Sequence, residues 1–170
     1  IESSTLVREN GKWLMGKQLD ALSVPSTIQG IILARLDRLD SVSKRTIQEA
    51  SVMGRIFDLD VLKRITIYGN SLMTSVDKLE SLDLVRARLG RQKTEYVFKH
   101  ALTQDVVYNG LLKKERQEIH EKIGRVMEDV YHNRLRDFYE PLAFHFRQGC
   151  FQHNAIHYLC KAGEKNLKRY

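Results

Sequence analysis

The sequence is poor in the residues that crosslink or interrupt a chain. Its 170 residues include two cysteines, two prolines and one tryptophan. Cys150 and Cys160 do not form a CxxC pair, which argues against a disulfide framework and a four-ligand zinc site. The longest purely aliphatic stretch, Ile31–Ala34, is far too short to cross a membrane. We therefore expect a protein of a reducing, cytoplasmic compartment, with no signal peptide and no membrane contact.

Negative charge is also scarce relative to positive charge. Lys and Arg number 28 against 21 Asp and Glu, which gives a formal net charge of +7. Such a surplus favours partners that carry phosphates or acidic surfaces. With 42% hydrophobic and 29% charged residues, the composition is that of a globular protein of one ordinary domain or two small ones. Because the chain begins at Ile1, we expect it to be a piece of a longer protein.

Local patterns divide the chain into three predicted segments, the first of which covers residues 1–22. Two short apolar runs there flank Asn10-Gly11. This dipeptide favours a type I′ turn, because both of its residues tolerate positive φ. We expect a β-hairpin followed by a polar linker.

The second predicted segment, residues 23–99, changes to helical spacing. Its apolar residues predict four helices, near residues 26–39, 42–53, 58–65 and 70–82. An alternating pattern then predicts the strands Val85–Leu89 and Tyr96–Phe98 on either side of a basic turn. Three helices followed directly by a basic hairpin are typical of a winged helix, which we expect over residues 42–99.

The third predicted segment, residues 100–170, is helical apart from a charged break at Asn133–Asp137. Helices are expected at Ala101–Leu112, Lys114–Tyr131, Tyr139–Arg147 and Gln152–Lys168. The tight Gln148-Gly149 turn between the last two suits the start of a tetratricopeptide-like array. The predicted fold class is therefore mainly α: a winged-helix domain with a small β-hairpin wing, followed by a helical bundle that begins such an array.

Catalytic motifs are missing from the sequence. It has no GxxxxGK[ST] phosphate loop, no GxGxxG and no HExxH. His153 and His157 are four residues apart and could share a helix face, as metal ligands would. No carboxylate or cysteine completes a ligand set, so we interpret them as part of a polar helix edge. We predict no catalytic residue and no metal site.

The basic hairpin raises the question of DNA binding. In a winged helix, the helix before the wing normally enters the major groove. Here that helix carries Asp77, Lys78 and Glu80 and no arginine, the commonest reader of guanine. The wing itself is basic and would supply mainly phosphate affinity. We therefore expect no sequence-specific DNA binding, and a wing that faces solvent, another domain or an acidic partner.

Four blocks of the sequence occur in order and together span almost the whole chain. The blocks are Val24–Gly30 with Ala34–Leu39, Ala50–Phe57, Tyr96–Tyr108, and Leu142–Phe146 with Ala155–Gly163. Together they resemble one family, the signal-transduction ATPases with numerous domains (STAND ATPases), of the kind fused to class III adenylate/guanylate cyclases. The similar stretch follows the ATPase core in that family. Residues 1–16, with Trp13, resemble the hairpin that ends the core.

The resemblance implies a regulatory fragment without catalysis of its own. The phosphate loop, magnesium carboxylate and cyclase residues of the family would lie upstream, so the fragment should hold no cofactor, whereas its parent would use ATP or ADP with Mg²⁺. The implied partners are the preceding ATPase core and proteins that bind the helical repeats. The alternatives are a DNA-binding winged-helix transcription regulator and a protein-interaction scaffold.

The resemblance also marks one candidate site, at Lys99 and His100. In related nucleotide switches, the winged-helix domain offers a His from a Met-His-Asp-like motif to the β-phosphate of ADP. Phe98–Leu102 occupies the equivalent place, with Lys99 instead of Met and Ala101 instead of Asp. An imidazole N–H at a helix N-terminus can donate to a phosphate oxygen, and a lysine adds positive charge. The alternative is a structural His100 that packs against the wing and caps the helix.

Overall fold

The computed structural model describes residues 6–9, 12–15, 26–89 and 94–167, and the chain falls into two compact units, Ile1–Ile31 and Ile32–Tyr170. In the first unit, β1 (Leu6–Glu9) and β2 (Lys12–Met15) pair antiparallel, with Glu9 opposite Lys12. This pairing agrees with the expected hairpin. The Asn10-Gly11 turn and the linker after β2 lie outside the described residues.

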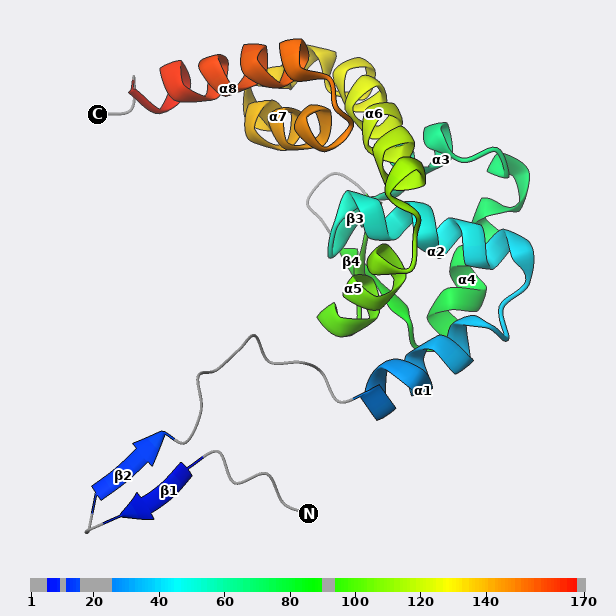
Figure 1. Ribbon diagram of the computed structural model, residues 1–170. Coiled ribbons are helices and arrows are strands. Elements are labelled where there is room, and N and C mark those ends of the chain that lie inside the picture. Colours follow the sequence, from blue (N-terminus) through cyan, green and yellow to red (C-terminus); the bar gives the residue numbers. More distant parts are fainter. Residues whose placement is uncertain (1–5, 10–11, 16–25, 90–93, 168–170) are drawn as a thin grey trace. The chain divides into compact units, whose positions relative to one another are not determined.

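From α1 onward the fold is mainly helical, as predicted, with one small sheet (Figure 1). The elements up to the end of this sheet are α1 (Ser26–Leu36), α2 (Ser41–Met53), β3 (Ile56–Asp58), α3 (Leu59–Ile65), the 3-10 helix η1 (Gly69–Ser71), α4 (Leu72–Ser81), β4 (Val85–Leu89) and β5 (Thr94–Phe98). The three strands are antiparallel in the order β3-β5-β4. We call α2 to β5 the sheet region.

Polar side chains set the ends of the helices in the sheet region. The Asp40 carboxylate accepts a hydrogen bond from the Ser43 backbone N–H at 2.8 Å, which satisfies one of the free donors at the start of α2. Asp58 does the same for α3 through the Asp60 N–H, at 2.7 Å. Helix α2 ends at Gly54, whose φ of +117° would strain any residue with a Cβ. The chain can therefore turn sharply from α2 into β3.

The two faces of the sheet differ in character. Phe57, Tyr96 and Phe98 are buried on the inner face, where the Phe57 ring stacks on Tyr96 at 5.8 Å and meets Phe98 edge-on at 5.7 Å. The outer face carries the alternate residues of each strand. Strand register places Ile56 of β3 and Arg86 of β4 on either side of Val97 in β5. The inner face thus belongs to the core, and the outer face mixes apolar and charged groups.

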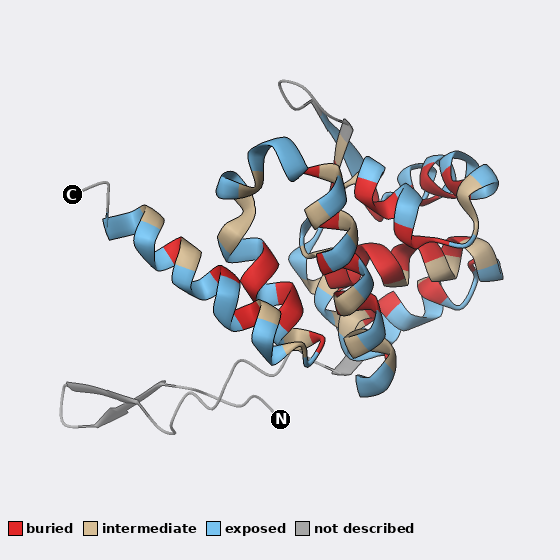
Figure 2. Ribbon diagram, turned by 90° about the horizontal axis from the view of Figure 1, so that it is seen from above, coloured by how far each residue is buried: buried red, intermediate tan, exposed pale blue. Residues whose placement is uncertain are grey.

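The described chain after β5 forms the helical region. It comprises α5 (Ala101–Asn109), α6 (Lys113–Val130), the 3-10 helix η2 (His132–Phe138), α7 (Tyr139–Gln148) and α8 (Gln152–Leu167). The expected break at Asn133–Asp137 lies within η2, which separates α6 from α7 and has a non-helical backbone at Arg134. Helices α7 and α8 run side by side next to α6 in Figure 1, and Figure 2 shows buried residues where the helices face one another.

Helices α6 and α7 approach closely at a glycine. A Cβ on Gly124 of α6 would lie 2.9 Å from the Phe146 ring of α7, so only glycine leaves room for this ring. Phe146 is 1% exposed and also stacks on Tyr158 of α8 at 5.8 Å. One phenylalanine therefore ties three helices together. Among the helices that the structure describes, none combines the length and the apolar character that a membrane crossing requires.

Candidate functional site

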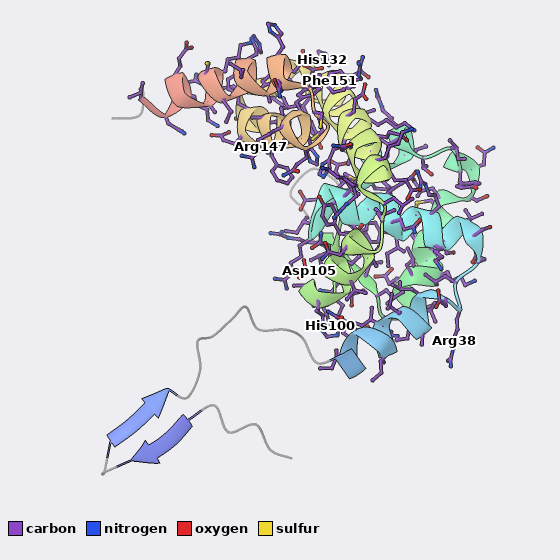
Figure 3. All side chains as sticks on the ribbon, in the orientation of Figure 1. Arg38, His100, Asp105, His132, Arg147 and Phe151 are labelled. Atoms are coloured by element: carbon purple, nitrogen blue, oxygen red, sulfur yellow. The ribbon has the colours of Figure 1, made fainter. Side chains whose placement is uncertain are left out.

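His100 lies at the junction between β5 and α5 and is labelled in Figure 3. Its carbonyl accepts a hydrogen bond from the Thr103 N–H at 3.0 Å, which begins the first turn of α5. The imidazole is exposed and makes no capping hydrogen bond. His100 therefore holds the N-cap position of α5 without a cap from its side chain, and its exposed ring is accessible to a ligand.

Lys99 is not a free cation. Its ammonium group is paired with the carboxylate of Asp83, and its backbone N–H donates to the carbonyl of Leu84 at 3.0 Å. Asp83 follows α4 with a φ of +62°, a left-handed conformation that Asp tolerates better than most residues. The hydrogen bond from Lys99 lowers the pKa of Asp83 below its usual value, and Arg35 and His100 act in the same direction. The sequence analysis identified Lys99 only as added positive charge, and no local pattern pointed to Asp83.

Arg35 brings a third basic group to this place. Its guanidinium donates a hydrogen bond to the Leu82 carbonyl, near the end of α4. This contact joins α1 to the turn that carries Asp83. We call Arg35, Asp83, Lys99 and His100 the α5 cap cluster. It contains two cations, one carboxylate and one titratable imidazole beside the N-terminus of a nine-residue helix.

The α5 cap cluster has the chemistry of an anion-binding site. The first backbone N–H groups of a helix and its dipole both favour negative charge. A phosphate oxygen near His100 would accept from the imidazole and would favour its protonated form. The groups of the cluster are hydrogen-bond donors and cations around one carboxylate, so the arrangement is suited to binding an anion.

A second polar group, which sequence reasoning missed, lies buried in the helical region. His120 of α6 and His145 of α7 are 1% and 5% exposed, and their Nδ1 atoms are 2.9 Å apart. His120 Nε2 lies 3.2 Å from the hydroxyl of Tyr108 on α5. This buried chain links three helices.

Burial keeps both imidazoles neutral. It lowers the pKa of His120 to about 4, with a further contribution from Arg116, and the pKa of His145 to about 3, with His120 as the second cause. A hydrogen bond between two Nδ1 atoms needs one protonated and one free nitrogen, which two neutral rings of opposite tautomer provide. The partners are 25 residues apart, so spacing gave no signal for the pair. The one indication of burial in the sequence is the position of His145 between the apolar residues Leu142 and Phe146.

The remaining histidine pair behaves differently. His153 and His157 both lie on α8 with exposed side chains. Within the described ranges, no group of three or more His, Cys, Asp or Glu side chains is arranged to hold a metal ion. Two of the basic wing residues, Arg91 and Lys93, lie outside the described residues.

Comparisons with known proteins add no identification. No protein-family model matches the chain, and no match is found among curated proteins or solved structures.

Proposed function

We propose that this chain is a non-catalytic regulatory module of a multidomain signal-transduction ATPase of the adenylate/guanylate cyclase type. The observation that carries the proposal is the order of the sheet region. The helix, short strand, two helices and hairpin of this region, with the sheet order β3-β5-β4, are compatible with a winged helix. The α7–α8 hairpin is likewise compatible with the first pair of a tetratricopeptide-like array.

The α5 cap cluster would recognise the nucleotide state. His100 would donate to the β-phosphate of ADP held by the preceding ATPase core. Lys99 could then divide its charge between the phosphate and Asp83, which is its partner without an anion. Bound ADP would hold the module against the core, exchange for ATP would release it, and the helical region would transmit the change to protein partners.

The first experiment uses this chain alone. Titration with ADP or inorganic pyrophosphate, followed by NMR of the histidine side chains, should shift the His100 signals first and most. The affinity should be weak, because the core that would hold the nucleotide is not part of the chain. The His100→Ala variant should lose this binding, and His153→Ala, which changes an equally exposed histidine on α8, should retain it. His120 is unsuitable as a control because it is buried.

The second experiment uses a longer protein that contains this chain and an ATPase core. A charge-assisted hydrogen bond contributes roughly 1.5–3 kcal/mol, so His100→Ala should weaken ADP retention about 10- to 150-fold. The thermal stability of the isolated chain should stay nearly unchanged, because the lost partner is a ligand. Unchanged ADP affinity together with a loss of several degrees in Tm would refute the site.

A further inference from the structure

A basic groove lies on the outer face of the sheet, apart from the α5 cap cluster. It has a volume of about 410 Å³ and is lined by Arg55, Ile56, Arg86, Ala87, Arg88 and Val97. All three arginines are exposed. We call this feature the arginine groove.

The positive charge of the arginine groove is poorly compensated. In the part of the chain that the structure describes, the side chains of Arg55 and Arg86 form no ion pair or hydrogen bond, and Arg88 lies 4.0 Å from Glu95. By contrast, the ammonium group of Lys44 lies 2.8 Å from the Asp37 carboxylate. Like charges held together repel one another, and an anion would relieve that repulsion.

The floor of the arginine groove is apolar. Ile56 is 41% exposed and lies directly opposite Val97 in the strand register. Arg86 lies opposite Val97 on the other side. A ligand that lies across the strands would therefore meet apolar surface in the middle and guanidinium groups around it. Guanidinium groups bind carboxylates through two parallel hydrogen bonds.

We propose that the arginine groove binds an acidic peptide segment of a partner protein. Carboxylates of the segment pair with Arg55, Arg86 and Arg88, and one apolar side chain rests on Ile56 and Val97. This inference is independent of the nucleotide contact proposed at His100. It identifies an acidic peptide as the kind of partner that the outer face of the sheet would bind.

Two observations restrict the mode of binding. The Ala87 N–H on the edge strand β4 already donates to the Glu80 carboxylate at 3.0 Å, so the segment lies across the sheet face and does not add a strand at this edge.

Helix α4 presents the exposed acids Asp77 and Glu80, and its one lysine, Lys78, is paired with Asp40. A nucleic-acid duplex that used α4 with the hairpin would meet these carboxylates, which disfavours it.

The test measures binding of a short labelled peptide in which glutamates flank a single leucine. Fluorescence anisotropy should show binding that weakens with salt and is lost when the glutamates are replaced by glutamines. Arg86→Glu and Arg55→Glu should each lower the affinity about tenfold or more. Arg38→Glu, the same charge change at an exposed arginine outside the groove, should leave it unchanged. Circular dichroism should show the wild-type fold in all three variants.

A double-mutant cycle tests the apolar floor. Ile56→Ser should weaken the leucine peptide several-fold and should have little effect on a peptide with alanine in place of leucine. Equal binding of the glutamate and glutamine peptides, or equal effects of Arg86→Glu and Arg38→Glu, would overturn the proposal. Tighter binding of a DNA duplex, lost in Arg86→Glu, would overturn it in favour of a nucleic-acid partner.

Discussion

The sheet region and the helical region bury titratable groups of opposite kinds. The sheet region buries Glu49, which is 4% exposed and whose carboxylate accepts from the Arg45 guanidinium at 3.0 Å; burial raises the pKa of Glu49. The helical region buries the His120–His145 pair, whose pKa values burial lowers. A fall in pH therefore favours the folded state through Glu49 in the sheet region and disfavours it through the histidine pair in the helical region.

This difference separates the two kinds of chemistry in the chain. In the sheet region the groups available to ligands are on the surface, in the arginine groove, and the α5 cap cluster lies around the junction between this region and α5. In the helical region the distinctive polar groups are enclosed between α5, α6 and α7, where they couple packing to protonation. The proposed ligand sites therefore lie on or beside the surface of the first region, whereas the distinctive polar groups of the second respond to pH from inside the core. Four predictions would break or sharpen this comparison.

The largest effect is expected from Phe146→Ala in the core of the helical region. Removing a ring that is 1% exposed should lower the free energy of unfolding by about 3–5 kcal/mol, because the site opposite Gly124 cannot collapse. Urea unfolding followed by circular dichroism measures the loss. Hydrogen exchange should increase most in α7 and α8. Phe144→Ala, at a ring that is 44% exposed, is the control and should cost less than half as much; equal losses would contradict this packing.

The next effect is a loss of stability in acid from the His120–His145 pair. An imidazole whose pKa is lowered by folding gives its full stabilisation at pH values above its unfolded pKa, near 6.5. This stabilisation is lost as the pH falls toward the folded pKa, which is about 4 for His120 and about 3 for His145. At about 1.4 kcal/mol for each pKa unit, one imidazole accounts for about 2 kcal/mol between pH 7 and pH 5. Unfolding curves at the two pH values give the difference.

The control for this prediction replaces both rings. The double variant His120→Leu/His145→Leu should lose most of the dependence on pH between 7 and 5. Replacement of the exposed pair His153 and His157 should preserve it. If the double variant unfolded with the wild-type dependence, the buried pair would not be its source.

A smaller effect of opposite sign is expected from Glu49→Gln. Folding raises the pKa of the Glu49 carboxyl group. Such a group contributes its full stabilisation of the fold at pH values below its unfolded pKa, and this stabilisation is lost as the pH rises through its folded pKa. The glutamine side chain does not ionise, so the variant avoids this loss and should have a free energy of unfolding at pH 7 that is higher by about 1 kcal/mol or less. Urea unfolding at pH 7 and pH 4 should show a gain only at pH 7. A larger gain at pH 4 would show that Glu49 is ionised at low cost.

The smallest effect concerns the surface and leaves stability unchanged. Asp83→Asn keeps a side chain that tolerates the φ of +62° and frees Lys99 from its carboxylate partner. Pyrophosphate should then bind the α5 cap cluster about two- to threefold more tightly, as measured by the histidine NMR titration. Asp77→Asn, at an exposed acid on α4, is the matched control. Equal gains in the two variants would mean that net charge alone sets the affinity.

The sequence predicted most of the helices and the β4–β5 hairpin, because long periodic segments report their own conformation. Strand β3 was missed because three residues are too few to show alternation, and its pairing with β5 joins residues about 40 positions apart. For the same reason no pattern revealed the pairing of Lys99 with Asp83 or of His120 with His145. The position of His100 before α5 was predicted correctly, and its contact with a nucleotide stays a prediction.

The fit of Phe146 against Gly124 also decides what kind of movement the last helices can make. Sliding α7 by one turn along α6 would drive the ring into a position that carries a side chain, so this contact opposes translation and would act as a pivot for a change of angle. The backbone after α7 adds a second stop, since a Cβ on Gly149 would lie 3.0 Å from the Glu121 backbone nitrogen. Helix α8 has 16 residues and is about 24 Å long, so a tilt of about 10° at the pivot moves its far end by about 4 Å. A small change in the angle between the α7–α8 pair and α6 would therefore be enlarged at the C-terminal end of α8.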